Sequence, residues 1–335
     1  MPNTEIMVTM PRRGVVTTFF DEERVRRLES IGRVHWNDND RQLTTEELCR
    51  AIRGIDICIT GWDSPCLDEA VMACADRLRP LAHTGGSVNG YASDAVYQRG
   101  VRVLSGNRVF AESVAEGTVA YMLAALRRIP HYSTGLANGC WPQTFANRGL
   151  LERSVGIVGY GMIARYLVEM LAPFRCRVQV YSRHIEPAEL QRTGMTKTDL
   201  PALFAGCDIV SLHTGLTAST RHLITEPLLR SMKPGAMLVN TARGAIVDEA
   251  ALCRVLADRP DLTAVLDVYE QEPLPADHPL CTLPNVLLMP HQAGPTIDRR
   301  PAVADSLLDD IEAFLSGGAL RCEISRSYAA GMTTR

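Results

Sequence analysis

The chain has 335 residues, of which 46% are hydrophobic and 22% charged, and its formal net charge is −3. This length suits two domains, and the composition is that of an ordinary globular protein. The small charge, with acids and bases interspersed, gives no reason to expect a nucleic acid or an anionic membrane as a partner.

The ten cysteines are scattered along the chain, and none forms a C-x-x-C pair. This spacing predicts small buried thiols in a reducing compartment rather than a disulfide framework or a structural zinc site, so we expect no metal. The N-terminus, MPNTEIMVTMPRRG, lacks the apolar run of a signal peptide. No stretch approaches about 18 uninterrupted apolar residues, the length that would cross a membrane. We therefore expect a cytoplasmic protein.

The first part of the chain alternates short apolar runs with segments of helix length. Five runs predict strands: Glu5–Met10, Arg33–Trp36, Ile55–Thr60, Leu78–His83 and Val101–Leu104. Four segments between them predict helices: Asp21–Ser30, Thr44–Arg53, Asp68–Asp76 and Ser93–Arg99. Thr44 and Glu47 have the spacing of a capping box, which satisfies free amides at a helix start. This alternation predicts parallel strands joined by right-handed crossovers, in a small five-stranded domain.

The second part repeats the alternation with more apolar strands. A long amphipathic helix is predicted first, over Glu112–Arg128, and Pro130 is expected to end it. Six strands follow: Val155–Val158, Val178–Tyr181, Asp208–Leu212, Met237–Asn240, Ala264–Val268 and Val286–Met289. Strands that are apolar on both faces suit a parallel sheet between two layers of helices, as in doubly wound dinucleotide-binding domains.

A last long helix, Ile297–Leu315, is predicted to return to the first domain. The predicted fold class is therefore α/β, with two doubly wound parallel-sheet domains and a cleft between them. The first domain is expected to be flavodoxin-like and discontinuous, with residues 1–108 and 295–335. Residues 109–294 are expected to form a dinucleotide-binding domain of the Rossmann type.

A glycine-rich turn follows the first strand of the second sheet, in the sequence SVGIVGYGMIA. Gly159 allows a tight turn, Gly161 lets the backbone approach a pyrophosphate, and the small Ala164 lets helix and strand pack closely. The free amides near Met162 and Ile163, at the helix start, would face the phosphates. Between a strand and a helix the motif predicts dinucleotide binding, and the alternative is a purely structural turn.

The end of the next strand predicts which dinucleotide is preferred. An acidic residue at this place bonds the adenosine ribose hydroxyls and repels a 2′-phosphate. Here the position is Ser182, and Arg183 follows. Without the carboxylate, and with a cation that can pair with a phosphate, NADP(H) is favoured and NAD(H) is the second choice. The alternative is that Arg183 is a solvated loop residue and that both cofactors are accepted.

Three further segments carry polar residues at or just past the ends of predicted strands, where open α/β sheets place their ligands. They are Asn240–Gly244, Leu266–Pro275 and Met289–Gly294. Together with the glycine motif they make the sequence resemble the D-isomer-specific 2-hydroxyacid dehydrogenase family, in its glyoxylate and hydroxypyruvate reductase branch. The resemblance extends from about Ile55 to Leu315 and is most specific between Val155 and Gly294.

Three side chains in these segments suit hydride transfer at the 2-carbon of a small 2-hydroxy or 2-keto acid. Arg243 has a planar fork that can engage the carboxylate and the 2-oxygen. His291, with an ordinary pKa of about 6.5, can accept the hydroxyl proton and return it. Glu272 would hydrogen-bond the far ring nitrogen and favour the imidazolium. Taken singly, each could be a surface ion-pair partner, a solvated turn residue or a structural histidine.

The resemblance implies further roles. Asp267 would contact the nicotinamide carboxamide, and Gly294 belongs to the loop behind the catalytic histidine. The nicotinamide side would be lined by Thr214, Thr241 and Ala242. The first domain, residues 1–108 and 295–335, would be the substrate-binding domain. Its backbone amides near Gly86 and Ser87 would bind the substrate carboxylate, unless this is a plain turn. The family usually forms homodimers, and we expect one here.

The sequence departs from the family pattern at residues 85–89, Gly-Gly-Ser-Val-Asn, which puts the substrate-side contacts in doubt. Selectivity for the substrate side chain is expected to depend on this loop and on the loop around Trp62. Formate-oxidising relatives lack an acid paired with the histidine, so Glu272 argues against that activity.

The leading hypothesis is an enzyme that reduces glyoxylate, hydroxypyruvate or a similar 2-keto acid. The alternative is a nicotinamide-sensing protein on the same fold, resembling the corepressor branch that recruits partners. An epimerase on a dinucleotide fold would need a Tyr-x-x-x-Lys pair or a similar base, and no such motif occurs in the sequence.

Overall fold

The computed structural model describes residues 4–141 and 146–333, and the chain divides into two compact units. The first unit contains Met1–Ala111 and Pro295–Arg335, and the second contains Glu112–Gly294. Residues 1–3 and 334–335 of the predicted substrate-binding domain, and residues 142–145 of the predicted dinucleotide-binding domain, lie outside the described residues. The binding roles expected of the two domains stay predictions.

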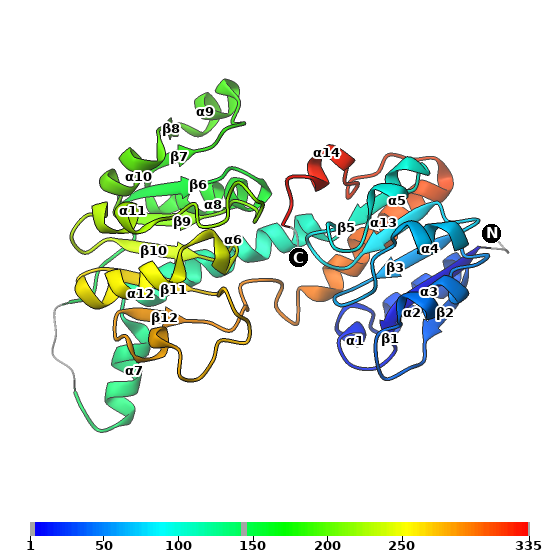
Figure 1. Cartoon of the computed structure of the whole chain (residues 1–335), viewed down its shortest axis with the longest axis horizontal. Coiled ribbons are helices and arrows are strands. Elements are labelled where there is room, and N and C mark those ends of the chain that lie inside the picture. The colour runs from blue at the N-terminus through cyan, green and yellow to red at the C-terminus, as the bar shows by residue number, and fades with distance from the viewer. Residues whose placement is uncertain (1–3, 142–145, 334–335) are drawn as a thin grey trace. The chain divides into compact units, whose positions relative to one another are not determined.

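The first unit is built on a five-stranded parallel sheet in the order β2-β1-β3-β4-β5 (Figure 1). Its strands are β1 (Glu5–Pro11), β2 (Arg33–Asn37), β3 (Ile57–Thr60), β4 (Pro80–His83) and β5 (Arg102–Ser105). The three central strands β1, β3 and β4 are almost wholly buried, because helices cover both faces of the sheet.

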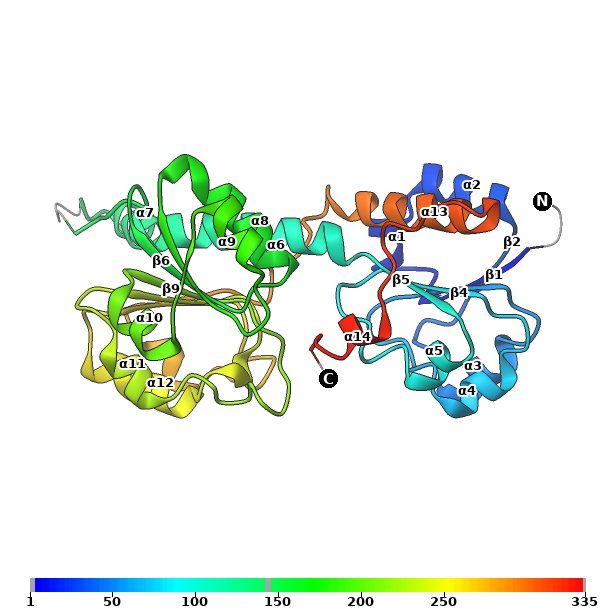
Figure 2. The ribbon, with the colours of Figure 1, turned by 90° about the horizontal axis from the view of Figure 1, so that it is seen from above.

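The helices of this unit form two layers (Figure 2). One face carries α1 (Val16–Phe19), α2 (Glu22–Ile31) and α13 (Arg300–Ser316), and the other carries α3 (Thr45–Ala51), α4 (Glu69–Cys74) and α5 (Asp94–Gln98). A short helix, α14 (Arg326–Ala329), follows α13. The capping box predicted at Thr44 and Glu47 is present at the start of α3. The last long helix, α13, buries Val303, Leu307 and Ile311 against the first sheet.

The second unit is built on a seven-stranded parallel sheet in the order β12-β11-β10-β9-β6-β7-β8. Its strands are β6 (Ser154–Val158), β7 (Arg177–Tyr181), β8 (Thr196–Lys197), β9 (Ile209–Leu212), β10 (Met237–Asn240), β11 (Thr263–Leu266) and β12 (Val286–Leu288). The prediction of six strands missed β8, because its two residues are exposed and contain no apolar run. The fold class, two doubly wound parallel-sheet units, is confirmed.

Helices also cover both faces of the second sheet (Figure 2). Side chains of α6 (Asn107–Leu126) and α8 (Met162–Leu171) fill the core on one face. The core on the other face contains side chains of α10 (Leu200–Gly206), α11 (Glu226–Ser231) and α12 (Glu249–Asp258). The remaining helical segments are α7 (Ile129–Ala137), α9 (Pro187–Thr193) and the short 3₁₀ turns Ala172–Phe174, Gly244–Ile246 and Pro279–Thr282.

The long helix α6 differs from its prediction at both ends. It begins at Asn107, in the first unit, and ends at Leu126 in the second. Pro130 does not end it but stands in the first turn of the next helix, α7, where a missing N–H does no harm. Arg128, with a left-handed φ of 53°, makes the break between the two helices.

Within the described residues, α6 is also the one helix long and apolar enough to cross a membrane by length and composition. The core helix of a globular domain passes the same test. Ala115, Met122 and Leu126 of α6 are buried in the core beside the seven-stranded sheet, and this packing accounts for part of the helix's apolar character.

Candidate active site

The glycine-rich turn joins β6 to α8 and leaves backbone amides open at the helix start. Gly159 has a φ of +90°, and a Cβ there would lie 2.8 Å from the His213 carbonyl oxygen and from the Thr214 nitrogen. Only glycine fits such a backbone. A Cβ on Gly161, in contrast, would meet nothing within 4 Å, so the chain faces open space at this point.

The start of α8 has the features of a phosphate-binding helix end. Gly161 is the N-cap and has no side chain that could satisfy the first amides, which belong to Met162 and Ile163. Ala164 is fully buried between helix and sheet, as expected for the small third position of the motif. Free amides and the positive end of the helix dipole together favour an anion. The turn therefore fits the pyrophosphate of a dinucleotide.

The two residues predicted to select the cofactor lie just after β7, the strand next to β6 in the sheet. Ser182 accepts a hydrogen bond from the backbone nitrogen of His184 at 3.4 Å. Arg183 is exposed, and in the described part of the chain it forms no ion pair. A guanidinium without a carboxylate partner is free to bind a phosphate.

Arg243 follows β10, and a tight packing contact fixes its loop. A Cβ on the next residue, Gly244, would lie 1.9 Å from the carbonyl carbon of Tyr269, so only glycine lets this loop pack on the loop after β11. The side chain of Asn240 stabilises this turn with two hydrogen bonds. It donates to the Arg243 carbonyl at 2.9 Å and accepts from the Ala242 nitrogen at 3.1 Å. Burial lowers the pKa of Arg243, and the negative charge of Glu272 opposes this effect. The guanidinium stays protonated at neutral pH.

Glu272 and His291 form the pair that the sequence predicted. The Nδ1 atom of His291 lies 2.7 Å from an oxygen of Glu272, whose other oxygen accepts a hydrogen bond from the Tyr269 nitrogen at 3.0 Å. Burial raises the pKa of Glu272, but the hydrogen bonds from His291 and Tyr269 and the charge of Arg243 outweigh it and hold the pKa below its usual value. Glu272 is therefore an ionised carboxylate at neutral pH.

The backbone at His291 has a left-handed φ of 55°. This conformation is uncommon for a residue with a side chain, and such residues cluster at functional sites. The contacts of Asp267 hold the loop in place, because its two carboxylate oxygens accept hydrogen bonds from the nitrogens of Gln292 at 2.7 Å and Ala293 at 2.9 Å. Burial raises the pKa of Asp267, and these two hydrogen bonds oppose the rise.

The other residues that the sequence predicts beside the cofactor follow strands of the second sheet. Thr214 follows β9, and Thr241 and Ala242 follow β10, both buried. The hydroxyl of Thr241 is 3.0 Å from that of Thr118 on α6. Gly294 is the last residue of the second unit, three residues after His291. Thr214, Thr241 and Ala242 thus lie at the carboxyl ends of the neighbouring parallel strands β9 and β10, where this architecture binds ligands.

Gly86 and Ser87 lie in the first unit, in the loop after β4. The Ser105 hydroxyl contacts the carbonyl oxygens of Gly85, at 2.9 Å, and Gly86, at 2.8 Å. The Ser87 hydroxyl donates to the Thr333 carbonyl at 3.0 Å. A Cβ on Gly86 would make only an ordinary contact, 3.6 Å from Phe110, so packing on that side does not require glycine. The role of this loop in binding a carboxylate stays a prediction.

The structure adds one residue that the sequence reasoning did not single out. The hydroxyl oxygen of Tyr269 lies 3.0 Å from the Leu266 carbonyl oxygen and 2.9 Å from the Met289 carbonyl oxygen, and its proton can be donated to either. The same oxygen accepts a hydrogen bond from the Met289 nitrogen at 3.1 Å. It thus joins the ends of β11 and β12, which lead to Glu272 and His291. Its position three residues before Glu272 was the available signal, but the sequence does not reveal which strand the hydroxyl contacts.

Residues 119–293 match the family model described as "D-isomer specific 2-hydroxyacid dehydrogenase, NAD binding domain". A glyoxylate reductase of Thermofilum pendens is 35% identical over 280 residues, which are 81% of this chain and 82% of that protein. A D-3-phosphoglycerate dehydrogenase of Methanocaldococcus jannaschii is 31% identical over 305 residues, 90% of this chain. The chain spans only 57% of that longer relative. A solved 2-hydroxyacid dehydrogenase of Ketogulonicigenium vulgare is 26% identical, with a TM-score of 0.80 and coverage of 97% of this chain and 99% of that one.

Proposed function

The chain belongs to the D-isomer-specific 2-hydroxyacid dehydrogenase family, and from this premise we propose that it reduces a small 2-keto acid to the 2-hydroxy acid, with NADPH as the preferred hydride donor. The observation that carries the proposal is the His291–Glu272 pair, 2.7 Å apart, within electrostatic reach of Arg243. All three side chains follow adjacent strands of the sheet whose β6–α8 turn suits a dinucleotide.

Arg243 binds the substrate. Its half-buried guanidinium can form two parallel hydrogen bonds to a carboxylate, or one to the carboxylate and one to the 2-oxygen. Partial burial strengthens such a contact because less water competes for it. The bound 2-keto acid is then oriented with its carbonyl carbon exposed to attack, and the cation stabilises negative charge that develops on the 2-oxygen.

His291 moves the proton. Because Nδ1 is bonded to Glu272, Nε2 is the nitrogen left to face the substrate. In reduction the imidazolium donates its proton from Nε2 to the 2-oxygen, and in oxidation the neutral ring takes that proton back. Glu272 contacts His291 and the Tyr269 nitrogen, so its proposed role is that of a positioning residue that holds the ring and favours the charged form.

The cofactor supplies or accepts the hydride when it is bound. The amides of Met162 and Ile163 would hold its pyrophosphate, and Thr214, Thr241, Ala242 and Gly294 would line its nicotinamide end. The Asp267 carboxylate accepts hydrogen bonds from two backbone nitrogens of the loop that follows His291, and so holds this loop in place. Contact with the nicotinamide carboxamide is its second proposed role. Preference for NADPH is supported by Arg183, an exposed cation next to Ser182 at the place where NAD-preferring sites have an acid.

Glyoxylate and hydroxypyruvate are the substrates we propose first, since a curated relative with high coverage of both chains is a glyoxylate reductase. The test is a screen of glyoxylate, hydroxypyruvate, pyruvate and 3-phosphohydroxypyruvate, each with NADPH and with NADH, following the absorbance of the reduced nicotinamide. Turnover of at least one keto acid, faster with NADPH, is expected. No consumption of either cofactor with any acid would contradict the enzyme and favour the nicotinamide-sensing alternative.

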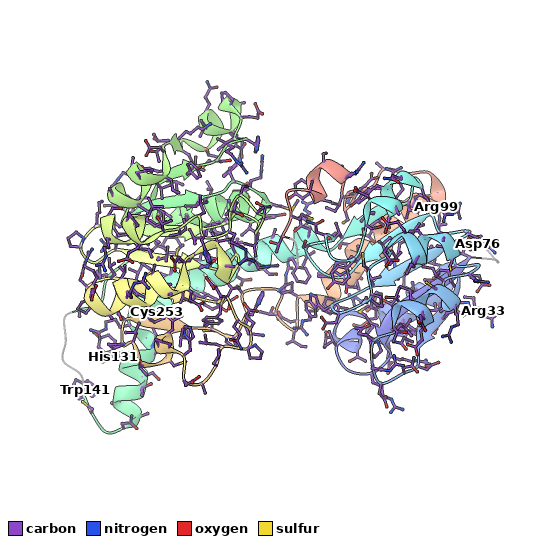
Figure 3. All side chains as sticks on the ribbon, in the orientation of Figure 1. Arg33, Asp76, Arg99, His131, Trp141 and Cys253 are labelled. Atoms are coloured by element: carbon purple, nitrogen blue, oxygen red, sulfur yellow. The ribbon has the colours of Figure 1, made fainter. Side chains whose placement is uncertain are left out.

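We also propose that the enzyme is a cytoplasmic homodimer that acts without a metal, a nucleic acid or a membrane. All ten cysteines are free thiols, as is usual in a reducing compartment. Exposed apolar side chains occur on and after α7: Ile129 and Leu136 are each 55% exposed and Trp141 is 74% exposed. Trp141 is labelled with His131 in Figure 3, beside α7. Such a group of side chains supports a contact with a second copy, which analytical ultracentrifugation would detect.

A further inference from the structure

Helix α9 follows the loop that carries Ser182 and Arg183, and its own residues hold it in place only weakly. It is seven residues long, none of its residues is buried, and Glu186 at its N-cap forms no side-chain cap hydrogen bond. Helices this short are not stable by themselves. In Figure 1, α9 stands beside β7 and β8, at the edge of the seven-stranded sheet. Its position therefore depends on contacts with neighbouring elements.

Glu189 of α9 supplies such a contact. Its carboxylate accepts a hydrogen bond at 2.7 Å from the hydroxyl of Tyr160, which stands between the two glycines of the β6–α8 turn. Arg165 of α8 donates to the same oxygen at 3.3 Å, and its guanidinium carbon lies 5.3 Å from the centre of the Tyr160 ring. The Glu189 side chain is only 12% exposed. A largely buried carboxylate thus ties α9 to the turn that suits a dinucleotide.

The ionisation states of the two partners fit this contact. Hydrogen bonds from Arg192 and Tyr160 lower the pKa of Glu189 to about 2, so its carboxylate is charged at neutral pH. Burial and the hydrogen bond to Glu189 raise the pKa of Tyr160 to about 12, so its hydroxyl keeps the proton that it donates. Two nitrogens of Arg192, on α9 itself, each lie 2.9 Å from a Glu189 oxygen. The helix therefore neutralises this charge on its own, and the bond to the turn serves another purpose.

The loop between β7 and α9 is held at its start, in its middle and at its far end. At the start, the Gly159 nitrogen donates to the Tyr181 carbonyl at 2.8 Å, which bonds the end of β7 to the glycine turn. In the middle, Ile185 is buried in the core beside the sheet. At the far end, Glu189 makes the contact with the turn. The exposed Arg183 lies within this loop, so its place relative to the glycine turn depends on these three contacts.

We propose that Tyr160 and Glu189 are positioning residues for cofactor selectivity, because their hydrogen bond holds the Arg183 loop at the distance from the glycine turn that an adenosine 2′-phosphate requires. This inference rests on the proposed function and adds two residues to cofactor selection. The turn would fix the pyrophosphate and Arg183 would bind the 2′-phosphate, so the protein sets the span between the two anions. NADH has no phosphate on this ribose, and its binding does not depend on that span.

The test compares KM for NADPH with KM for NADH, with the keto acid that the wild type reduces fastest. Tyr160→Phe removes the hydroxyl alone, and the ratio of KM for NADPH to KM for NADH is expected to rise by about 3- to 10-fold, the size of one lost hydrogen bond. The loss concerns binding, so kcat at saturating cofactor should change little.

Two variants of Glu189 show whether its hydrogen bond or its charge matters. Glu189→Ala is expected to raise the same ratio at least as much as Tyr160→Phe does. Glu189→Gln keeps an oxygen that accepts from the Tyr160 hydroxyl, and is expected to restore most of the wild-type ratio. A ratio that falls in Glu189→Ala would mean that the carboxylate repels the 2′-phosphate, which contradicts the proposal.

A double variant shows whether Tyr160 acts through Arg183. In Arg183→Ala the 2′-phosphate has lost its partner, so the addition of Tyr160→Phe should not raise the ratio further. If Tyr160→Phe has its full effect in both backgrounds, or weakens NADPH and NADH equally, Tyr160 has only a structural role and the proposal is wrong. The control is Glu226→Ala on α11, which removes a glutamate that also pairs with two arginines, Arg230 and Arg254, each at 2.8 Å. It is expected to leave the ratio unchanged.

Should the wild type reduce no keto acid, the proposed function fails, and cofactor binding still decides about the Tyr160–Glu189 contact. The dissociation constants of NADPH and NADH, measured by nicotinamide fluorescence, then replace the two KM values, and the same changes of the ratio are expected. If Arg183→Ala leaves the wild-type ratio unchanged, or if the wild type binds neither dinucleotide, the loop does not select the cofactor and the inference is wrong.

Discussion

The two units share one architecture but carry different chemistry at the carboxyl ends of their strands. In the second unit these ends hold charged side chains that bond one another or the backbone, as Glu272 does with His291 and Asp267 with the next loop. In the first unit, the corresponding region around β3 holds aromatic rings about the Arg300 guanidinium with an unpaired nitrogen. The two units have the same kind of fold, and the residues of the loops after the strands determine which ligands or reactions each unit suits.

A histidine–glutamate pair occurs in each unit and sharpens this comparison. His35 and Glu5 lie on β2 and β1 with Nε2 and Oε2 2.5 Å apart, and the same two residue types meet at 2.7 Å in His291 and Glu272. The first pair is on the strands of the sheet. The second is on loops past the strand ends, beside Arg243 and near the dinucleotide turn. The two pairs have similar geometry, so we base the proposed catalytic role of His291 and Glu272 on the residues around them.

The largest effect is expected when the histidine of the second pair is removed. His291→Ala loses the proton donor, so kcat for keto-acid reduction should fall on the order of 10²- to 10⁴-fold. Binding of NADPH, measured by its fluorescence, should stay as in the wild type. His35→Ala is the matched control, since it removes an imidazole that also faces a glutamate, and it should keep full activity. Equal losses in the two variants would contradict the distinction between the pairs.

The next effect concerns the charge of Glu272. Because its pKa lies below the usual value, the carboxylate is ionised at neutral pH and stabilises the imidazolium of His291. Reduction needs a proton on Nε2 of His291, so the ionised carboxylate supports the step. In Glu272→Gln the negative charge is gone, so kcat for reduction should be about 10-fold lower than in the wild type at neutral pH. The difference should shrink at low pH, where the wild-type carboxylate takes up a proton and loses its charge. A pH–rate profile of both variants measures this, and a difference that stays constant with pH would assign Glu272 a merely structural role.

A smaller and more selective effect is expected at the cofactor end. Arg183→Ala should raise KM for NADPH by about 10- to 100-fold, the size of a charged hydrogen bond, and should change KM for NADH little. The matched control is Arg175→Ala, at another exposed arginine in the second unit that pairs with Glu152 at 3.1 Å. If KM for NADH rises as much as KM for NADPH, Arg183 does not bind the 2′-phosphate.

The smallest effect is expected from a helix cap in the first unit, at the start of α3. Thr44→Ala removes the capping box of α3, in which the Thr44 hydroxyl accepts from the Glu47 nitrogen and the Thr44 nitrogen donates to the Glu47 carboxylate. Loss of such a cap costs about 1 kcal/mol of stability. Thermal unfolding should therefore begin roughly 2–4 °C lower, a shift typical of 1 kcal/mol in a domain of this size. Activity at room temperature should be unchanged, and a loss of turnover would link α3 to the site.

Much of the fold and part of the site could be predicted because their signals are local. The strands are short apolar runs, and the β6–α8 turn is spelled out within a few residues, from Gly159 to Ala164. β8 was missed because its pairing with β7 depends on neighbouring strands and not on apolar residues. The start of α7 was missed because Pro130 was expected only to end the preceding helix. Proline is also common in the first turn of a helix, which is where Pro130 stands.

The sequence by itself determined the alternation of strands and helices in most of the chain, the glycine turn and the residue types suited to hydride transfer, since each depends on neighbours along the chain. Only the tertiary structure decided which of them meet. Asp267 reaches backbone amides 25 and 26 residues away, Tyr269 reaches Met289, and Arg300 stands over Trp62 and Phe19 from the far end of the chain. Such contacts arise when parallel strands and returning helices bring distant loops together, and no short stretch of sequence records them.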